Sequence, residues 1–269
     1  MTMPAAGAAP VTAGVGISVD SVAQTFRRGG TVTHALENVD LAIAPGEFVA
    51  VLGPSGCGKS TLMKIVAGLM APTRGEVRID GKLITTPHHD LGVVFQSPVL
   101  LDWRTILGNV LVQIELRGGN ARDYRERALA LLRKVGLGDF YDRMPRELSG
   151  GMRQRAAIVR ALIHDPPVLM MDEPFGALDA LTREQMRIDL EKLWLERRQT
   201  TVFITHGISE AVALADRVVV MTPRPGRIDR IIPIELPRPR DKAVVSSRAF
   251  AHHCDAITEC FMRYGVIQY

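Results

Sequence analysis

The segment that most constrains this chain is a glycine-rich loop between a short apolar run and a helical pattern. Residues 48–52 read Phe-Val-Ala-Val-Leu, as in a buried strand, and residues 62–67 have apolar spacing typical of a helix. The order of strand, glycine loop and helix matches the phosphate-binding loop G-x-x-x-x-G-K-S/T. The nine loop positions are Gly53, Pro54, Ser55, Gly56, Cys57, Gly58, Lys59, Ser60 and Thr61.

Each residue type in this loop suits the phosphates of a nucleotide. The glycines let backbone N–H groups curl around the β-phosphate, and the N-terminus of the following helix adds partial positive charge. Lys59 would span the β- and γ-phosphates, and the Ser60 hydroxyl would take one position around Mg²⁺. We therefore predict that all nine loop residues belong to a nucleotide site.

Cys57 occupies a variable position of the loop. We interpret it as a small, tolerated side chain with no catalytic or redox role. Because a helix N-terminus can lower the pKa of a thiol, alkylation of Cys57 is expected to compete with a bound nucleotide.

Two carboxylates follow a second buried-strand pattern. Residues 168–171 read Val-Leu-Met-Met and lead directly into Asp172 and Glu173. Ligands of open α/β sheets bind at the carboxyl ends of the strands. We predict that Asp172 holds Mg²⁺ through its water shell and that Glu173 orients and polarises the attacking water. The alternative is that both carboxylates only cap the following loop.

A third motif begins with Ser149, Gly150 and Gly151, within Leu-Ser-Gly-Gly-Met-Arg-Gln-Arg at residues 148–155. A capping serine and two glycines at the start of a helix leave backbone N–H groups free to bind an anion. Taken alone, the segment is also compatible with an ordinary helix start.

Apolar patterns around these motifs predict an α/β core. Strands are expected at residues 17–26, 39–43, 48–52, 77–79, 91–95, 168–171, 201–204 and 218–221, and Asp80-Gly81 marks a hairpin. Helical spacing is clearest at Ala128, Leu129, Leu131, Leu132 and Val135, and further helices are expected at 153–163 and 181–197. Strands that alternate with helices imply a buried parallel sheet.

Composition narrows the class further. A chain of 269 residues with 46% hydrophobic positions fits one large globular domain or two small ones. The net charge of +4 is too small for a dedicated nucleic-acid binder, so nucleic acid is not an expected partner. Three scattered cysteines suit neither a disulfide framework nor a four-ligand zinc site. No apolar run approaches the roughly 18 residues of a membrane span, and the N-terminus has no signal-peptide pattern.

The order of these motifs resembles the ATP-binding subunit of an ATP-binding cassette (ABC) transporter over residues 17–230. Residues 53–61 match the family's Walker A motif, 148–154 its signature loop, 168–173 its Walker B motif and 176–179 its D-loop. The resemblance implies a P-loop ATPase core with an antiparallel β subdomain and a helical insertion at about 97–147. It also implies ATP and Mg²⁺ as cofactors.

The same resemblance assigns three further residues. Gln96 matches the Q-loop glutamine that senses Mg²⁺ and the γ-phosphate, His206 matches the switch histidine, and Phe26 matches the aromatic that stacks on adenine. The structural alternatives are a solvated amide, a strand-end histidine and a core aromatic. The implied catalytic set is Glu173, His206 and Gln96, and the implied metal set is Ser60, Gln96 and Asp172.

Two positions depart from the family pattern. Met152 replaces the glutamine that is common after the signature glycines, and Gly207 follows His206 where many relatives have aspartate. We expect the first change to be minor and the second to loosen the switch.

The resemblance also implies partners. Two copies would pair head to tail, so that ATP on Lys59 of one chain meets Ser149 and Gly151 of the other. The permease would consist of separate transmembrane subunits, with a solute-binding protein as an indirect partner. The chain would then be a peripheral subunit on the cytoplasmic face of the inner membrane.

Three segments, 98–110, 221–228 and 236–240, look like the nitrate, sulfonate and taurine branch of bacterial importers. The alternative for the Pro/Arg-rich stretches is a stiff, solvated linker, and the basic residues between 220 and 242 could also touch lipid headgroups. The rival function is a soluble ABC ATPase that acts on ribosomes, DNA or cluster assembly. A regulatory subunit that binds ATP without turnover is less favoured, because Glu173 and His206 are both present.

The ends of the chain complete the predicted organisation. Residues 1–15 are expected to be a disordered leader, 16–240 the ATP-binding domain and 241–269 a C-terminal helical tail. The helical run at 249–264 carries His252, His253, Cys254 and Cys260. Their spacing does not suit a closed tetrahedral metal site, so we interpret the run as a helix packed on the core or on a partner.

Overall fold

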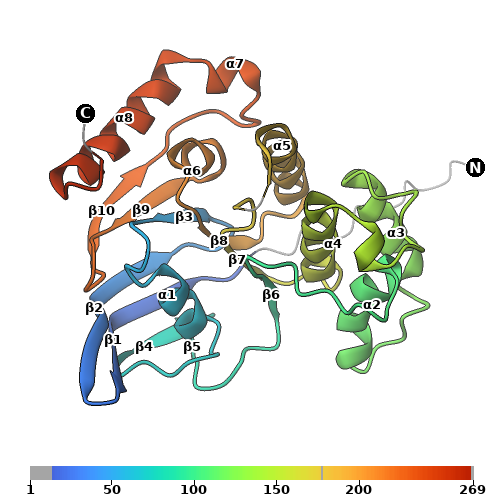
Figure 1. Cartoon of the computed structure of the whole chain (residues 1–269), viewed down its shortest axis with the longest axis horizontal. Coiled ribbons are helices and arrows are strands. Elements are labelled where there is room, and N and C mark those ends of the chain that lie inside the picture. Colours follow the sequence, from blue (N-terminus) through green and yellow to red (C-terminus); the bar gives the residue numbers. More distant parts are fainter. Residues whose placement is uncertain (1–13, 177, 268–269) are drawn as a thin grey trace, which may run out of the picture.

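The computed structural model describes residues 14–176 and 178–267. In this part of the chain, a six-stranded sheet lies at the centre, an antiparallel sheet covers one side, and helices cover the other (Figure 1). The central sheet has the order β10-β9-β3-β8-β7-β6. Its strands are β3 (Phe48–Leu52), β6 (Leu91–Val94), β7 (Val168–Asp172), β8 (Thr200–Ile204), β9 (Arg217–Met221) and β10 (Ile228–Pro233).

The register of the central sheet brings the ends of its strands together. Strand β3 pairs in parallel with β8 and β9, and β7 pairs in parallel with β8 and β6, whereas β10 is antiparallel to β9. Asp172 at the end of β7 lies opposite Ile204 at the end of β8, and Val51 lies opposite the same Ile204. The loops that follow these strands therefore meet at one edge of the sheet.

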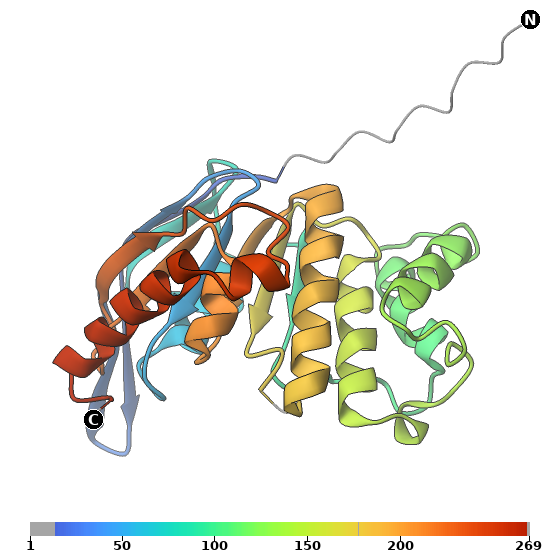
Figure 2. The same cartoon turned by 90° about the horizontal axis from the view of Figure 1, so that it is seen from above.

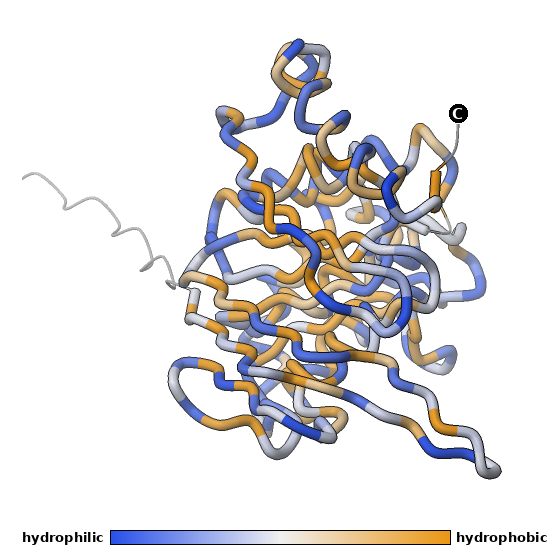
Figure 3. The backbone as a smooth tube through the Cα atoms, turned by 90° about the vertical axis from the view of Figure 1, so that its left-hand side faces the viewer, coloured by the Kyte–Doolittle hydropathy of each residue, from blue (hydrophilic) through white to orange (hydrophobic). Residues whose placement is uncertain are grey.

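The apolar run of β3 is continuous because both faces of the strand are buried. Phe48, Ala50 and Leu52 face the helices, whereas Val49 and Val51 face the antiparallel sheet and α1 (Lys59–Val66). Hydrophobic residues are concentrated in the interior of the fold, and hydrophilic residues are frequent along the outer loops (Figure 3). This burial on two sides is typical of a parallel sheet between layers, as the sequence predicts.

The antiparallel sheet has the order β2-β1-β4-β5. Asp80 and Gly81 both have positive φ, 52° and 70°, so the predicted hairpin is confirmed. One strand begins eight residues earlier than predicted, because its first half lies in an exposed hairpin where no apolar alternation marks it. The strands are β1 (Ile17–Arg28), β2 (Thr31–Ile43), β4 (Arg74–Ile79) and β5 (Lys82–Leu83).

A helical group lies at one end of the molecule (Figure 2). It begins after β6 and includes the predicted stripe, of which Ala128 and Leu132 are fully buried. The N-terminal helix of the group packs on the helix that begins at Gly150, so the helical layer continues beyond residue 147. Its elements are α2 (Ile106–Leu116), α3 (Arg125–Lys134), the short 3-10 helix Pro145–Glu147 and α4 (Gly150–Leu162).

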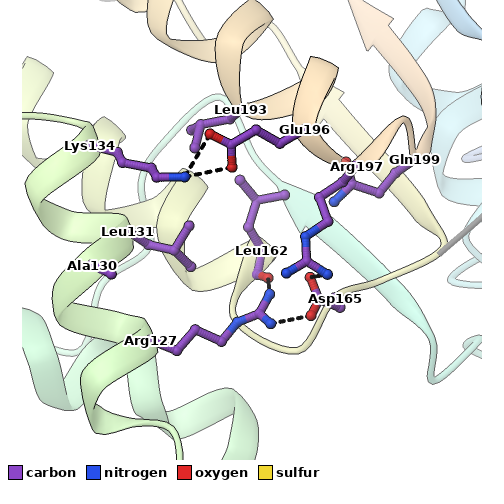
Figure 4. A pocket seen from close by; sticks show the side chains of 10 residues that line it. All are labelled: Arg127, Ala130, Leu131, Lys134, Leu162, Asp165, Leu193, Glu196, Arg197 and Gln199. Carbon is purple, nitrogen blue, oxygen red and sulfur yellow. Dashed lines mark hydrogen bonds and ion pairs between the residues drawn. The ribbon is translucent and has the colours of Figure 1, made fainter. Parts of the chain in front are cut away.

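Ion pairs join this helical group to α5 (Ala180–Arg197), which covers the central sheet (Figure 4). A cleft of about 190 Å³ separates α3 from α5. Arg127 pairs with Asp165 in the turn after α4, and Arg197 contacts the same carboxylate at 3.1 Å. Lys134 Nζ lies 2.6 Å from Glu196 Oε1.

The segment after β9 differs from the prediction. Residues 228–233 form an edge strand that the sequence analysis missed, and the solvated-linker interpretation is wrong for Arg238 and Arg240. Arg238 lies 4.5 Å over the ring of Trp194, and Arg240, which is 1% exposed, donates to the carbonyls of Val212 and Ala215 at 2.7 and 2.6 Å. These two arginines therefore fasten the chain to the core and are not available to lipid headgroups.

The C-terminal segment forms α7 (Lys242–Val245) and α8 (Arg248–Arg263). Phe250, Ile257 and Phe261 of α8 are buried, and α8 packs on α6 (Ile208–Leu214), so the predicted helix lies against the core. Within the described part of the chain, no three His, Cys, Asp or Glu side chains gather as a metal site would require.

Most of the predicted leader, residues 1–13, lies outside the described residues. Residues 14 and 15 are described, and Thr200 Oγ1 donates to the Val15 carbonyl at 2.7 Å, so contacts with the core begin before residue 16. No helix in the two described stretches of chain is long and apolar enough to cross a lipid bilayer.

Candidate active site

Four loops meet at the carboxyl edge of the central sheet. The phosphate-loop motif follows β3, and Asp172 ends β7 with Glu173 directly after it. His206 follows β8, and Gln96 follows β6. The parallel register described above thus brings together residues that are up to 153 positions apart, from 53 to 206.

The glycine loop has the conformation that its sequence demands. Gly56 and Gly58 have φ of 74° and 109°, which favour glycine, and a Cβ on Gly58 would lie 2.6 Å from Leu36 Cδ2. Lys59 is 6% exposed, and its ammonium donates to the carbonyls of Gly53 and Pro54 at 2.8 and 3.1 Å. A buried cation is therefore held inside the loop by two carbonyl oxygens.

Ser60 and Asp172 form an oxygen pair beside this cation. Ser60 Oγ donates to Asp172 Oδ1 at 3.0 Å. Burial raises the pKa of the Asp172 carboxyl, and the Ser60 hydrogen bond opposes that rise. A hydroxyl and one carboxylate fit Mg²⁺, which is commonly held by one or two carboxylates together with substrate phosphates.

Glu173 connects the other two loops. It has φ of 45°, unusual for a residue other than glycine, and its N–H donates to the Ile204 carbonyl at 2.9 Å. Its Oε2 lies 3.4 Å from His206 Nδ1 and 3.5 Å from Gln96 Nε2. The three residues assigned to catalysis are thus in contact in the folded chain.

Gly207 is hydrogen-bonded to its neighbours in the folded chain. The Gly207 N–H donates to Thr205 Oγ1 at 3.0 Å, and the Thr205 hydroxyl in turn donates to Glu210. A Cβ on Gly207 would lie 2.9 Å from Glu210 Cδ, at the flexible end of that side chain, so a small shift of Glu210 would make room for it. The expected loosening of the switch at Gly207 stays a prediction.

An open pocket of about 410 Å³ lies over the loop. Nine residues of the predicted site line it: Phe26, Ser55, Gly56, Gly58, Lys59, Ser60, Thr61, Gln96 and Glu173. Three more residues line it that the sequence analysis missed: Thr33, Ala35 and Arg224. Phe26 is 39% exposed at the pocket, so the core-aromatic alternative is wrong.

Gly53, Pro54 and Cys57 are not among the residues that line the pocket. Cys57 is 1% exposed, and burial raises the pKa of its thiol. The expectation of a lowered pKa is therefore wrong: desolvation of the thiol outweighs the Lys59 charge and the backbone hydrogen bonds that lower its pKa. The interpretation of Cys57 as a small packing residue agrees with this burial.

Sequence comparison identifies the family. The family model described as ABC transporter matches residues 36–176, which contain the loop, both carboxylates and Gln96. An uncharacterized ABC transporter ATP-binding protein of Methanocaldococcus jannaschii is 47% identical over 231 residues, 86% of each chain. The chain belongs to the ABC transporter family.

Two relatives of this ABC chain carry the name of a solute. The aliphatic sulfonates import ATP-binding protein of Bacillus cereus is 41% identical over 252 residues, 94% of this chain and 98% of the relative. The taurine import ATP-binding protein of Ruegeria pomeroyi is 46% identical over 216 residues, 80% of this chain and 81% of the relative.

Solved structures agree with the family. A dimeric bacterial ABC transporter cassette superposes with a TM-score of 0.74 at 36% identity, over 81% of this chain and 99% of that chain. The same cassette in a post-hydrolysis state, bound to ADP and Pi, superposes with a TM-score of 0.73. The chain is thus an ABC ATPase, which binds and hydrolyses ATP.

The signature residues of the ABC chain lie apart from its own pocket. Ser149 Oγ accepts the Met152 N–H at 3.3 Å and so caps α4. Gly151 faces α5, where a Cβ would lie 2.7 Å from Thr182 Cγ2. Neither these residues nor Gly150 line the pocket that holds Lys59.

Proposed function

We propose that this ABC cassette powers the import of an aliphatic sulfonate such as taurine. The observation that carries the proposal is the similarity to a sulfonate-import relative, which covers 94% of this chain and 98% of the relative and so extends beyond the cassette motifs. The similarity to a taurine-import relative supports the same solute class.

The site residues have separate roles in ATP hydrolysis. The P-loop backbone and Lys59 bind the β- and γ-phosphates, and Phe26 stacks on the adenine. Ser60, Asp172 and the amide oxygen of Gln96 would hold Mg²⁺, which would neutralise phosphate charge. Glu173 accepts the proton of the attacking water, and His206, 3.4 Å from Glu173, orients that carboxylate. Together these groups position the water in line with the γ-phosphate.

The working unit is a head-to-tail dimer. Ser149, Gly150 and Gly151 lie outside the pocket of their own chain, and the cap of α4 presents backbone N–H groups that could bind a phosphate from a second copy. In support, the similar solved cassettes are described as dimeric. ATP between the two chains holds the closed dimer, and hydrolysis releases it.

The dimer acts on a separate permease. The cassette would bind transmembrane subunits at the cytoplasmic face of the inner membrane and respond only indirectly to a solute-binding protein. ATP-driven closure and opening of the dimer would then drive the permease between two conformations.

Solute uptake tests the proposal. A strain that lacks this chain should fail to take up taurine and alkanesulfonates but grow normally on sulfate. The wild-type chain should restore uptake, whereas the Lys59→Ala and Glu173→Gln variants should not. Unchanged sulfonate uptake in the deletion strain, or loss of nitrate uptake alone, would exclude this solute class.

A further inference from the structure

The loop between β9 and β10, residues 222–227, lies directly against the phosphate-binding loop. Arg224 donates from Nε and Nη2 to the Gly56 carbonyl at 3.1 and 2.9 Å. A Cβ on Gly226 would lie 2.0 Å from the Cys57 carbonyl oxygen. The two backbones therefore touch, although 168 residues separate Arg224 from Gly56.

Contacts that do not involve the Arg224 side chain fix the position of this loop. Gly226 donates to the Ala35 carbonyl at 3.0 Å, and Glu37 donates to the Gly226 carbonyl at 3.0 Å, so the loop is hydrogen-bonded to β2. Thr222 Oγ1 accepts the Arg227 N–H at 3.0 Å, which closes the loop on itself. The loop that carries Arg224 is thus held in place by its own hydrogen bonds, and these bonds place the guanidinium next to Gly56.

The Arg224 contact acts on the part of the P-loop that surrounds phosphate. Gly56 C=O and Cys57 N–H belong to one planar peptide, and the Cys57 N–H donates to the Pro54 carbonyl at 3.2 Å. The two Arg224 donors on the carbonyl therefore hold this turn of the loop from its other side. Gly56 has φ of 74°, in the left-handed region. Because glycine adopts many other backbone conformations as readily, contacts from outside the loop help to hold this one. The amides of such a loop bind phosphate only when they converge.

The arginine also adds charge to the pocket. Arg224 lines the same pocket as Lys59, and the two hydrogen bonds to Gly56 use two of the five N–H donors of a guanidinium. The remaining donors stay available in a pocket that takes a polyanion.

We propose that Arg224 is a positioning residue: by holding the Gly56 carbonyl, it keeps the turn at Gly56–Cys57 in the conformation in which the P-loop receives the β- and γ-phosphates of ATP. This inference rests on the proposed function of the pocket as the ATP site. The residue acts through the P-loop, so its effect depends on how many phosphates the nucleotide carries.

Equilibrium binding of unlabelled nucleotides, measured by displacement of a ribose-labelled fluorescent ATP, tests the inference. Arg224→Ala should weaken the binding of ATP and ADP about tenfold, or about 1.4 kcal/mol, and leave the affinity for AMP within about twofold of the wild-type value. Arg224→Lys, which keeps one charged donor, should recover part of that loss. In steady-state hydrolysis, KM for ATP should rise about tenfold while kcat changes little.

The matched control is Arg227→Ala. Arg227 belongs to the same loop but pairs with Glu37 at 2.9 Å on the surface, away from Gly56. This variant should bind ATP as the wild type does. If Arg224→Ala unfolds, Arg224→Lys and Arg224→Gln supply the same comparison.

The outcomes separate the inference from the proposed function. ATP affinity of Arg224→Ala equal to that of Arg227→Ala would overturn the positioning role while leaving the ATP site intact. An equal loss for AMP and ATP would also overturn it, because a phosphate-specific effect would then be absent. A wild-type chain that binds no ATP would overturn both.

Discussion

Substitution of Glu191 by alanine should destabilise the fold more than any surface ion-pair change. Glu191, 4% exposed in α5, accepts the Arg240 N–H at 3.0 and 3.1 Å and Arg238 Nη1 at 3.2 Å. Arg238 also lies over the ring of Trp194 and donates to Asp216. The carboxylate therefore joins α5 to the segment between β10 and α7.

The expected cost follows from burial. Removal of one partner of a buried ion pair costs about 3–5 kcal/mol. Because Asp216 still pairs with Arg238 at 2.8 Å, we expect the lower end of this range for Glu191→Ala. In Glu191→Ala, the Arg240 N–H also loses its acceptor inside the protein. A loss of this size lowers the unfolding temperature of a chain this long by roughly 10 °C.

Thermal and urea unfolding followed by circular dichroism would measure the loss. Glu37→Ala is the matched control, because Glu37 also pairs with an arginine, Arg227, but at the surface. That variant should unfold at the wild-type temperature. Glu191→Gln should fall between the two, since the amide oxygen can still accept from Arg240. A loss of less than about 1 kcal/mol for Glu191→Ala would refute the view that this network fastens the C-terminal segment.

Four further predictions concern the phosphate-binding loop and the two carboxylates beside it. Lys59→Ala removes the buried cation of the loop and should weaken ATP binding at least tenfold in the displacement assay; unchanged affinity would count against its role. Glu173→Gln should bind ATP normally but lose nearly all turnover and elute as a dimer with ATP on size-exclusion chromatography, whereas near-normal turnover would contradict its role as base. Cys57 should react slowly with a thiol reagent in the native state, with or without ATP, because burial raises the pKa of its thiol; rapid native reaction would contradict the packing. Burial also raises the pKa of Asp172, so the folded state holds that proton to higher pH than the unfolded chain. The contribution of Asp172 to stability therefore falls as pH rises through the window between the two pKa values. Without nucleotide and above neutral pH, Asp172→Asn should unfold a few degrees higher than wild type, yet it should lose Mg²⁺-dependent turnover.

The sequence predicts those parts of the fold in which burial is continuous or a turn has special chemistry. Strand β3 is buried along all five residues, and its apolar run matches the predicted 48–52. The Asp80-Gly81 hairpin is confirmed because both residues adopt the positive φ that these types tolerate. Such signals are local, so one sequence is enough to read them.

Elements with mixed exposure were missed or shortened. Strand β10 has only half-buried and exposed residues and ends in Pro233, so neither alternation nor a continuous apolar run marks it. Arg238 and Arg240 are charged and lie between prolines, which suggested a solvated linker. Their burial depends on Glu191, Asp216 and the carbonyl ends of α6, which no local pattern reports.

In the site, too, the residues of local motifs were predicted, and the residue that depends on distant contacts was missed. Lys59, Asp172 and Glu173 belong to short motifs next to strands, and the parallel register brings them together as the motif order predicts. Arg224 was missed because its place in the pocket depends on contacts of its loop with β2 and Gly56. The signal that could have found it is the run Thr-Pro-Arg-Pro-Gly-Arg after β9, whose prolines and glycine indicate a turn of defined shape.

Capture of bound proteins tests most directly the proposed action of this ABC ATPase on a permease. Tagged Glu173→Gln protein would be purified with ATP from detergent-solubilised membranes of the source organism, with Lys59→Ala as the control, and the bound proteins identified by mass spectrometry. We expect a polytopic permease to be recovered with Glu173→Gln and to take up sulfonates when the solute-binding protein is supplied. Recovery of ribosomal or DNA-associated proteins without a permease would contradict the transport function and leave only the ATPase chemistry.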